Sequence, residues 1–229
     1  MSNGREALVR QLREAVESLE HRFGGGVSSD ELVECELHRW LDGGDNPLEW
    51  HDPEHVTPDE WFFITTLYGT MTLARQRTHI RRFFRPLLVE AAGRDVRNFA
   101  PGIPAYVGLR APWMRTRLCR MGEILRERGI TMSEYVRRLQ ELERRATPDN
   151  PTPALDQLVR DHRAGGAKTI SVFVRDCVGG NCFPIDSRVE RELRRRGLPV
   201  DERQLVGLSL AIGCNPRQVA RMFYGAGGD

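Results

Sequence analysis

The chain has 229 residues, and its 34 basic and 32 acidic side chains leave a formal net charge of +2. Hydrophobic residues make up 40% of it, enough for a folded core, but they occur in runs too interrupted for a membrane span. The first residues lack the apolar stretch of a secretory signal, and five irregularly spaced cysteines favour reduced thiols. We therefore expect a cytoplasmic protein that is neither secreted nor embedded in a membrane.

The small net charge hides a polarity along the chain. Residues 1–60 contain 5 arginines and 15 acidic residues, a net charge of −10, whereas residues 61–229 contain 29 basic and 17 acidic residues, a net charge of +12. A basic body behind an acidic N-terminal segment is typical of a protein with a phosphate-binding face. The alternative is that these charges only solvate helix surfaces, as we expect for Arg137-Arg138 and Arg144-Arg145.

Every periodic segment has helical spacing, and strand-like alternation is absent. We predict an all-α fold with helices over 5–22, 28–41, 58–90, 112–128, 132–146, 153–162, 167–178, 187–196, 201–212 and 216–223. Polar, glycine- or proline-containing linkers at 24–26, 43–53 and 146–152 separate some of them.

Several of these helices carry start signals. Thr57-Pro58-Asp59-Glu60 predicts a capping box with proline at the first helical position. Thr131 with Glu134, Thr152 before Pro153, and Asn215 before Pro216 mark three further N-termini.

The chain has only one lysine, Lys168, beside 33 arginines. An arginine does not lose its proton at accessible pH, so it cannot serve as an amine nucleophile or form a Schiff base. A codon bias towards arginine would give the same count, with Lys168 left by chance. The residues around Lys168 decide whether it is a catalytic amine or such a chance lysine.

Lys168 lies in a predicted helix–turn–helix segment, at the start of its second helix. The helix 153–162 is interrupted at Gly165-Gly166, where paired glycines allow a tight turn. From Ala167 a second helix begins, with an apolar stripe through Ile170, Phe173, Val174 and Cys177. The N–H groups of such a turn and of the helix start suit a phosphate. Lys168 could itself be no more than a phosphate-binding side chain.

Asp186 lies eighteen residues after Lys168 and follows Pro184, which predicts an N-cap for the helix that begins near Ser187. The N–H groups and the dipole at a helix start favour an anionic carboxylate. The alternative is that Asp186 is only a cap.

These residues resemble the helix-hairpin-helix GPD superfamily of DNA glycosylases, to which endonuclease III belongs. Ala167-Lys168-Thr169 and Pro184-Ile185-Asp186-Ser187-Arg188-Val189 fall on its two motifs, and the resemblance covers about 61–206. It implies two helical subdomains enclosing a cleft, with Lys168 as the base-displacing nucleophile and Asp186 as the catalytic carboxylate. Only Cys214 lies beyond Asp186, so the four-cysteine cluster of some relatives cannot form there. We expect no cofactor and no metal.

The resemblance also implies a DNA-binding surface. Its expected residues are Arg163, Ala164, Gly165, Gly166, Ala167 and Thr169 in the hairpin, Arg188 after the aspartate, and Met71, Arg75 and Gln76 near a wedge that fills the gap left by a flipped nucleotide. Trp40, Trp61 and Trp113 are candidates for the base pocket. Met71 buried at a helix junction and tryptophans buried in the core are the structural alternatives.

We divide the chain into residues 1–56, expected to pack with the C-terminal helices, a central subdomain 57–152, and a segment 153–229 with the hairpin and Asp186. The function implied is excision of an oxidised base, first of all 8-oxoguanine, from double-stranded DNA by a monomeric glycosylase with AP-lyase activity. The alternatives are a glycosylase for oxidised pyrimidines, a non-catalytic helix-hairpin-helix DNA-binding module, and an all-helical adaptor.

Overall fold

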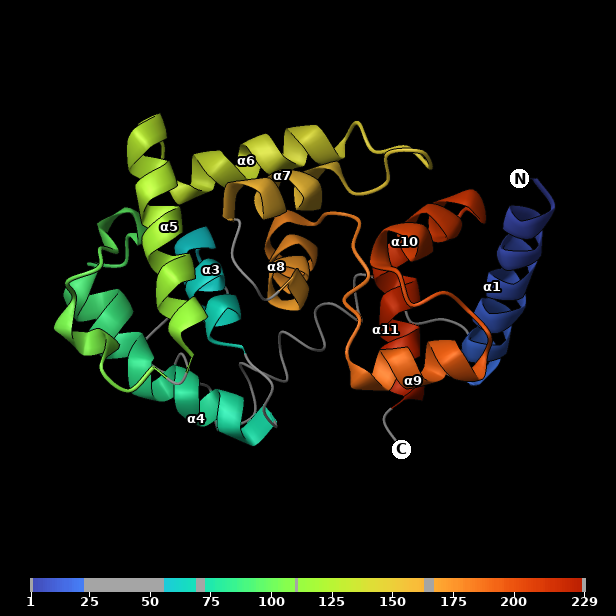
Figure 1. The fold of residues 1–229 in the computed structure, drawn as a ribbon, viewed down its shortest axis with the longest axis horizontal. Coiled ribbons are helices and arrows are strands. Elements are labelled where there is room, and N and C mark those ends of the chain that lie inside the picture. The colour runs from blue at the N-terminus through green and yellow to red at the C-terminus, as the bar shows by residue number, and fades with distance from the viewer. Residues whose placement is uncertain (1, 23–55, 69–72, 110, 163–166, 228–229) are drawn as a thin grey trace.

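The computed structural model describes residues 2–22, 56–68, 73–109, 111–162 and 167–227. This part of the chain is helical, with one isolated bridge between Thr147 and Asn150 and no strand, so the all-α prediction is confirmed (Figure 1). Its α-helices are α1 (Ser2–Arg22), α3 (Pro58–Leu67), α4 (Leu73–Phe83), α5 (Pro112–Arg128), α6 (Met132–Glu143), α7 (Pro153–His162), α8 (Ala167–Phe173), α9 (Ser187–Arg195), α10 (Glu202–Ala211) and α11 (Pro216–Ala226). No described helix has the length and apolar character needed to cross a membrane.

The predicted capping boxes are present. At the start of α3, Thr57 N donates to Glu60 Oε2 over 2.9 Å and Glu60 N donates back to Thr57 Oγ1 over 3.3 Å. Thr131 and Glu134 make the same exchange at the start of α6, over 2.8 and 3.2 Å. These reciprocal bonds satisfy N–H groups that have no partner within the helix, which is why the two N-termini could be located from four residues each.

The single helix predicted over 58–90 is wrong. The helix α3 ends at Leu67, and Tyr68 already has extended dihedral angles (φ −64°, ψ 132°). The next helix, α4, ends at Phe83 and continues as the π-helix η1 (Phe84–Ala91), which contains Pro86. A proline inside a helix removes one N–H donor and crowds the preceding turn, and a wider turn accommodates it.

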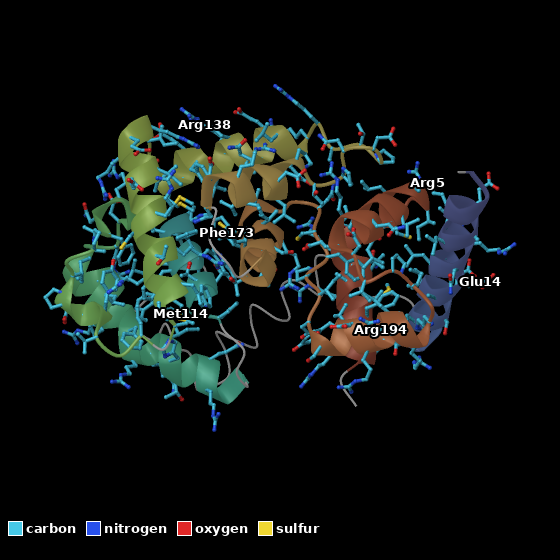
Figure 2. All side chains as sticks on the ribbon, viewed as in Figure 1. Arg5, Glu14, Met114, Arg138, Phe173 and Arg194 are labelled. Atoms are coloured by element: carbon cyan, nitrogen blue, oxygen red, sulfur yellow. The ribbon has the colours of Figure 1, made fainter. Side chains whose placement is uncertain are left out.

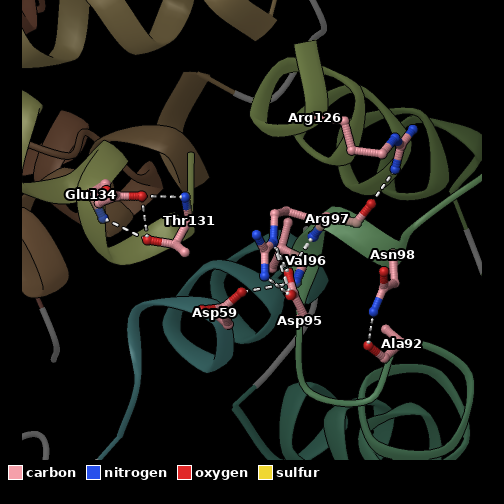
Figure 3. A network of polar contacts seen from close by, with 9 residues as sticks. All are labelled: Asp59, Ala92, Asp95, Val96, Arg97, Asn98, Arg126, Thr131 and Glu134. Carbon is pink, nitrogen blue, oxygen red and sulfur yellow. Dashed lines mark hydrogen bonds and ion pairs between the residues drawn. The ribbon is translucent and has the colours of Figure 1, made fainter. Parts of the chain in front are cut away.

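The segment that follows η1 is tied to α3 and α5 by polar contacts and close packing (Figure 3). Asp59 accepts a hydrogen bond from Val96 N over 2.8 Å, in the 3-10 helix η2 (Val96–Asn98). Gly122 lets α5 approach the same turn, because a Cβ atom there would lie 2.6 Å from the Phe99 carbonyl oxygen. Arg126 also donates to the Arg97 carbonyl. The start of α3 is thereby fixed against α5.

The described helices form two lobes, each with its own hydrophobic core (Figure 1). The first lobe contains α3 to α8 with the π-helix η4 (Val174–Val178), and its core extends from Phe62 to Cys182. Its aromatic rings meet edge-on or stacked, as at Phe63 with Phe84 and Phe99. Phe173 lies inside this lobe, whereas Arg194 extends from α9 in the other (Figure 2).

The second lobe combines the two ends of the chain. Leu12, Val16 and Leu19 of α1 are buried with Phe183 and with residues of α9, α10 and α11. Gln11 also donates to the Arg196 carbonyl over 2.5 Å. The two cores are divided between Cys182 and Phe183, so α7 and α8 belong to the first lobe and not with the segment that follows Asp186.

The start of α7 differs from its expected cap. The Thr152 hydroxyl is directed to Asp156 over 3.4 Å, and the Ala154 N–H is bound by Glu143 Oε2 of α6 over 3.2 Å. Glu143 Oε1 also accepts from Asn181 N over 2.6 Å. One carboxylate from a neighbouring helix thus joins the beginning of α7 to the segment that connects the two lobes, a contact between residues far apart in sequence.

Candidate active site

Asp186 is the N-cap of α9, as predicted. Its Oδ1 atom accepts hydrogen bonds from Arg188 N over 3.0 Å and from Val189 N over 2.9 Å. The side chain is half-buried, and Pro184 before it is buried. Two backbone N–H groups at a helix start hold the carboxylate in one orientation, as electrostatic stabilisation of a nearby cation requires.

Lys168 is the second residue of α8, and its side chain lies outside the described ones. The hairpin residues Arg163, Ala164, Gly165 and Gly166 also lie outside the described residues, as do Met71 and Trp40. The helices on either side of the hairpin, α7 and α8, begin and end where the sequence predicts, except that η4 continues α8 from Val174. The structure therefore places the backbone of Lys168 in the first turn of α8, a helix of the first lobe (Figure 1).

Thr169 was expected on the DNA-binding surface, but it is buried, with 8% of its surface exposed. Its hydroxyl oxygen accepts a hydrogen bond from Arg117 Nη1 of α5. Arg117 is itself 1% exposed, and its guanidinium lies 4.8 Å above the Trp113 ring. Burial lowers the pKa of Arg117 to about 10. Thr169 thus contacts the protein interior beside Lys168, because α8 is enclosed on all its described sides.

His162, the last residue of α7, packs against the same cluster. Its ring is stacked on Phe62, with centroids 5.4 Å apart and an interplanar angle of 19°. Among the described residues, neither ring nitrogen has a hydrogen-bond partner. Burial, together with the nearby Arg117 guanidinium, lowers the pKa of His162 to about 3. His162 is thus a neutral aromatic ring at the end of α7, and within the described part of the chain it belongs to no group of three or more potential metal ligands.

Arg188 is exposed in the first turn of α9, as expected for a phosphate contact. Its guanidinium lies 5.7 Å from the ring centroid of Tyr224, a residue of α11 that is 42% exposed. Gly227 allows this approach of α11 to α9, because a Cβ atom there would lie 2.6 Å from the Arg188 carbonyl oxygen. A cation and an aromatic face therefore lie together at Arg188, two residues after Asp186, and the exposed tyrosine was not predicted.

The remaining predicted residues are spread over the first lobe. Arg75 is exposed and Gln76 half-buried in α4. Trp61 and Trp113 are half-buried and pack on the first core, Trp113 beneath Arg117. The candidates for the base pocket that the structure describes thus contribute to the hydrophobic core.

A partly buried carboxylate joins the segments of Lys168 and Asp186. Glu202, the first residue of α10, accepts a hydrogen bond through Oε1 from Phe183 N over 2.7 Å. The same oxygen accepts from Ser171 Oγ of α8. Burial raises the pKa of Glu202. The sequence predicted position 202 only as part of a helix over 201–212, because its partners lie 19 and 31 residues away.

A second polar contact crosses the same junction. Asp176 of η4 binds Arg175 over 2.7 Å and Arg221 of α11 over 3.3 Å, and all three side chains are at most 14% exposed. On the exposed side, Arg203 of α10 binds Asp156 of α7 over 2.9 Å. Charged groups with defined partners thus join the lobes.

Comparisons with known proteins give no family to which the chain can be assigned. No family model matches it, and neither the curated proteins nor the solved structures contain a significant match. The interpretation of the site therefore depends on the residues themselves.

Proposed function

We propose that the protein is a DNA base-excision glycosylase with AP-lyase activity, in which Lys168 is the nucleophile and Asp186 the catalytic carboxylate. The observation that carries the proposal is the placement of the two motif residues. The only lysine of the chain lies in the first turn of α8, the helix whose Ser171 contacts Glu202 of the second lobe. Asp186 begins α9 with its carboxylate oriented by two backbone N–H groups.

The reaction requires a damaged nucleotide outside the helical stack. The unprotonated amine of Lys168 attacks C1′, the glycosidic C–N bond breaks, and the base leaves with the bonding electrons and takes up a proton. Loss of a proton from the lysine nitrogen and opening of the sugar ring give a Schiff base to C1′. Removal of a C2′ proton then expels the 3′ phosphate and nicks the strand. This sequence requires an amine that is unprotonated when it attacks and that can then lose a proton, which excludes every arginine in the chain.

Asp186 and Arg188 have separate roles in this proposal. The carboxylate of Asp186 opposes the positive charge that develops on the sugar as the glycosidic bond breaks. The exposed guanidinium of Arg188 binds a backbone phosphate, so its contribution falls as salt concentration rises. The half-buried Asp186 beside the exposed Arg188 supports this division between chemistry and binding.

For the substrate, we propose an oxidised base in double-stranded DNA. A lysine-bearing chain without a cluster-binding loop is most similar to the 8-oxoguanine branch of the family it resembles, and oxidised pyrimidines are the alternative. We propose that the protein acts as a monomer in the cytoplasm, on the DNA of the nucleoid.

The test of this function is borohydride trapping on duplexes that each carry one lesion or an abasic site. The wild-type protein should form a covalent adduct and nick the strand, and Lys168→Gln should lose both activities by at least ~10³-fold. Arg188→Gln is the matched control: it should bind DNA more weakly at physiological salt and still form the adduct at saturating protein. An undiminished adduct with Lys168→Gln would identify the N-terminal amine as the nucleophile and contradict the proposal.

The same panel separates the alternatives. Salt-dependent DNA binding with no preference for an abasic site and no nicking would identify a non-catalytic helix-hairpin-helix module. Absence of DNA binding at low salt would favour an adaptor. The lesion at which the strand is nicked identifies the base that the protein removes.

A further inference from the structure

Glu202 contacts the two segments that the proposed reaction uses and belongs to neither of them. Ser171, its partner in α8, lies three residues after Lys168, which is about one helical turn. Phe183, its other partner, lies three residues before Asp186. Both partners are fully buried, with 0% of their surfaces exposed. A single oxygen atom, Oε1 of Glu202, therefore relates the position of α8 to that of the chain leading into α9.

The short connections on both sides are stiff. Between Lys168 and Ser171 the backbone is α-helical. Between Phe183 and Asp186 it passes through the buried Pro184, whose φ is restricted by its ring. Asp186 is then held by the N–H groups of α9. A displacement of Glu202 therefore shifts both the first turn of α8, with Lys168, and the start of α9, with Asp186. No flexible loop lies between them to absorb it.

The side chain of Glu202 is not needed to begin its own helix. Asp201 is the N-cap of α10 and accepts a hydrogen bond from Gln204 N over 2.7 Å. Glu202 is directed away from α10 to the connecting segment and to α8. The chain therefore uses two adjacent acidic residues differently, one for local capping and one for a contact across the lobes.

We propose that Glu202 is a positioning residue that fixes α8, the helix of Lys168, relative to the segment that leads into Asp186. This inference rests on the proposed function, which assigns the chemistry to those two residues. Glu202 does not contact the substrate; it acts through Ser171 and Phe183. The two hydrogen bonds require an acceptor oxygen and no particular charge, so glutamine can replace glutamate at this position.

The first measurement is the single-turnover rate of borohydride trapping on an abasic-site duplex. Glu202→Leu removes the acceptor and should slow trapping by about 100-fold, since a displacement of about 1 Å in a reacting group has an effect of that order. Glu202→Gln should remain within about threefold of the wild-type rate, because the amide oxygen accepts the same two bonds. Asp201→Ala is the matched control: it removes the neighbouring acid and weakens α10 without touching α8, so its trapping rate should equal that of the wild type.

The second measurement does not depend on activity. Because the chain has one lysine, selective ¹³Cε labelling of lysine gives a single side-chain NMR signal. Glu202→Leu should shift this signal, whereas Glu202→Gln and Asp201→Ala should leave it in place. If the wild-type protein traps no abasic site, the proposed function fails, and the lysine signal still reports whether Glu202 controls the surroundings of Lys168.

A folded Glu202→Leu protein with unchanged trapping and an unchanged lysine signal would overturn the inference. If Glu202→Leu does not fold by circular dichroism, Ser171→Ala takes its place. This variant deletes one of the two hydrogen bonds and leaves a methyl group in a fully buried site. It should slow trapping by about tenfold and shift the lysine signal, and a wild-type result in both measurements contradicts the inference equally.

Discussion

The helices that carry Lys168 and Asp186 are built in opposite ways. In α8 and the first residue of η4, every residue from Thr169 to Val174 is at most 8% exposed. In α9, Val189, Glu192 and Leu193 are buried, while four arginines face solvent on the other side, Arg188, Arg191, Arg194 and Arg195. The first helix is placed by its neighbours on all sides, and the second by its cap and one apolar edge. The proposed site thus joins a residue positioned by tertiary packing to a residue positioned locally.

The largest expected effect tests the packing of α8. Phe173 is 1% exposed and meets Phe62 edge-on, with ring centroids 5.4 Å apart. Phe173→Ala should reduce the free energy of unfolding by about 3–5 kcal/mol, because the cavity adds to the lost apolar burial. Urea denaturation measures it. Arg191→Ala on the exposed face of α9 is the comparison, and a loss there as large as in Phe173→Ala would contradict the contrast between the helices.

The next largest effect is a dependence of the free energy of unfolding on pH, caused by His162 beside α8. The pKa of His162 is lowered to about 3 in the folded protein, against about 6.5 for an unfolded chain. Below pH 6.5 the unfolded state therefore binds the proton and the folded state does not, so stability falls as pH falls towards 3. Between pH 7 and 5 the wild-type protein should lose about 2 kcal/mol that His162→Phe retains. Urea midpoints at the two pH values measure the difference.

Glu192 on α9 is the control for this comparison. A hydrogen bond from Arg195 lowers the pKa of Glu192 to about 2, so its stabilisation is present above the unfolded pKa of about 4.3 and is lost as pH falls towards 2. Glu192→Gln should therefore leave the dependence between pH 7 and 5 as it is in the wild type. Equal slopes for His162→Phe and the wild type in that interval would show that the imidazole is not the group responsible.

The smallest effects separate the two functions of Asp186. Asp186→Ala should reduce the free energy of unfolding by about 1 kcal/mol, the usual contribution of an N-cap. Asp186→Asn should leave it unchanged, since asparagine caps a helix as well as aspartate, and yet should lose base excision because the negative charge is gone. Thermal melts with a single-turnover excision assay measure both quantities. If the Asp186→Asn protein still excises the base, Asp186 serves only as a helix cap and is not the catalytic carboxylate.

Local signals predicted much of the helical framework. The bounds of α5 and α7 agree with the predicted 112–128 and 153–162, and four N-termini carry the predicted caps, at Thr57, Thr131, Asp186 and Asn215. Apolar periodicity and capping act over a few residues, so a sequence displays them directly. The division of the predicted helix 58–90 depends on Pro86 and on the dihedral angles of Tyr68, and the first of these was visible in the sequence.

Contacts between distant segments were beyond such signals. The burial of Thr169 against Arg117, the capping of α7 by Glu143 and the bridging of Ser171 and Phe183 by Glu202 each join residues separated by 11 to 52 positions. A threonine in a hairpin and a glutamate at a helix start have the same sequence pattern whether they face solvent or a neighbouring helix.

The sequence alone determined that the described part of the chain is helical and where most of its helices begin. It also determined that one lysine and one capping aspartate are eighteen residues apart, because these properties depend on composition and near neighbours. The tertiary structure alone decided that α8 is enclosed, that the cores divide between Cys182 and Phe183, and that Glu202 joins the segments of Lys168 and Asp186. Burial and long-range hydrogen bonds depend on which surfaces meet when all the helices pack together, and that choice is made by the whole chain.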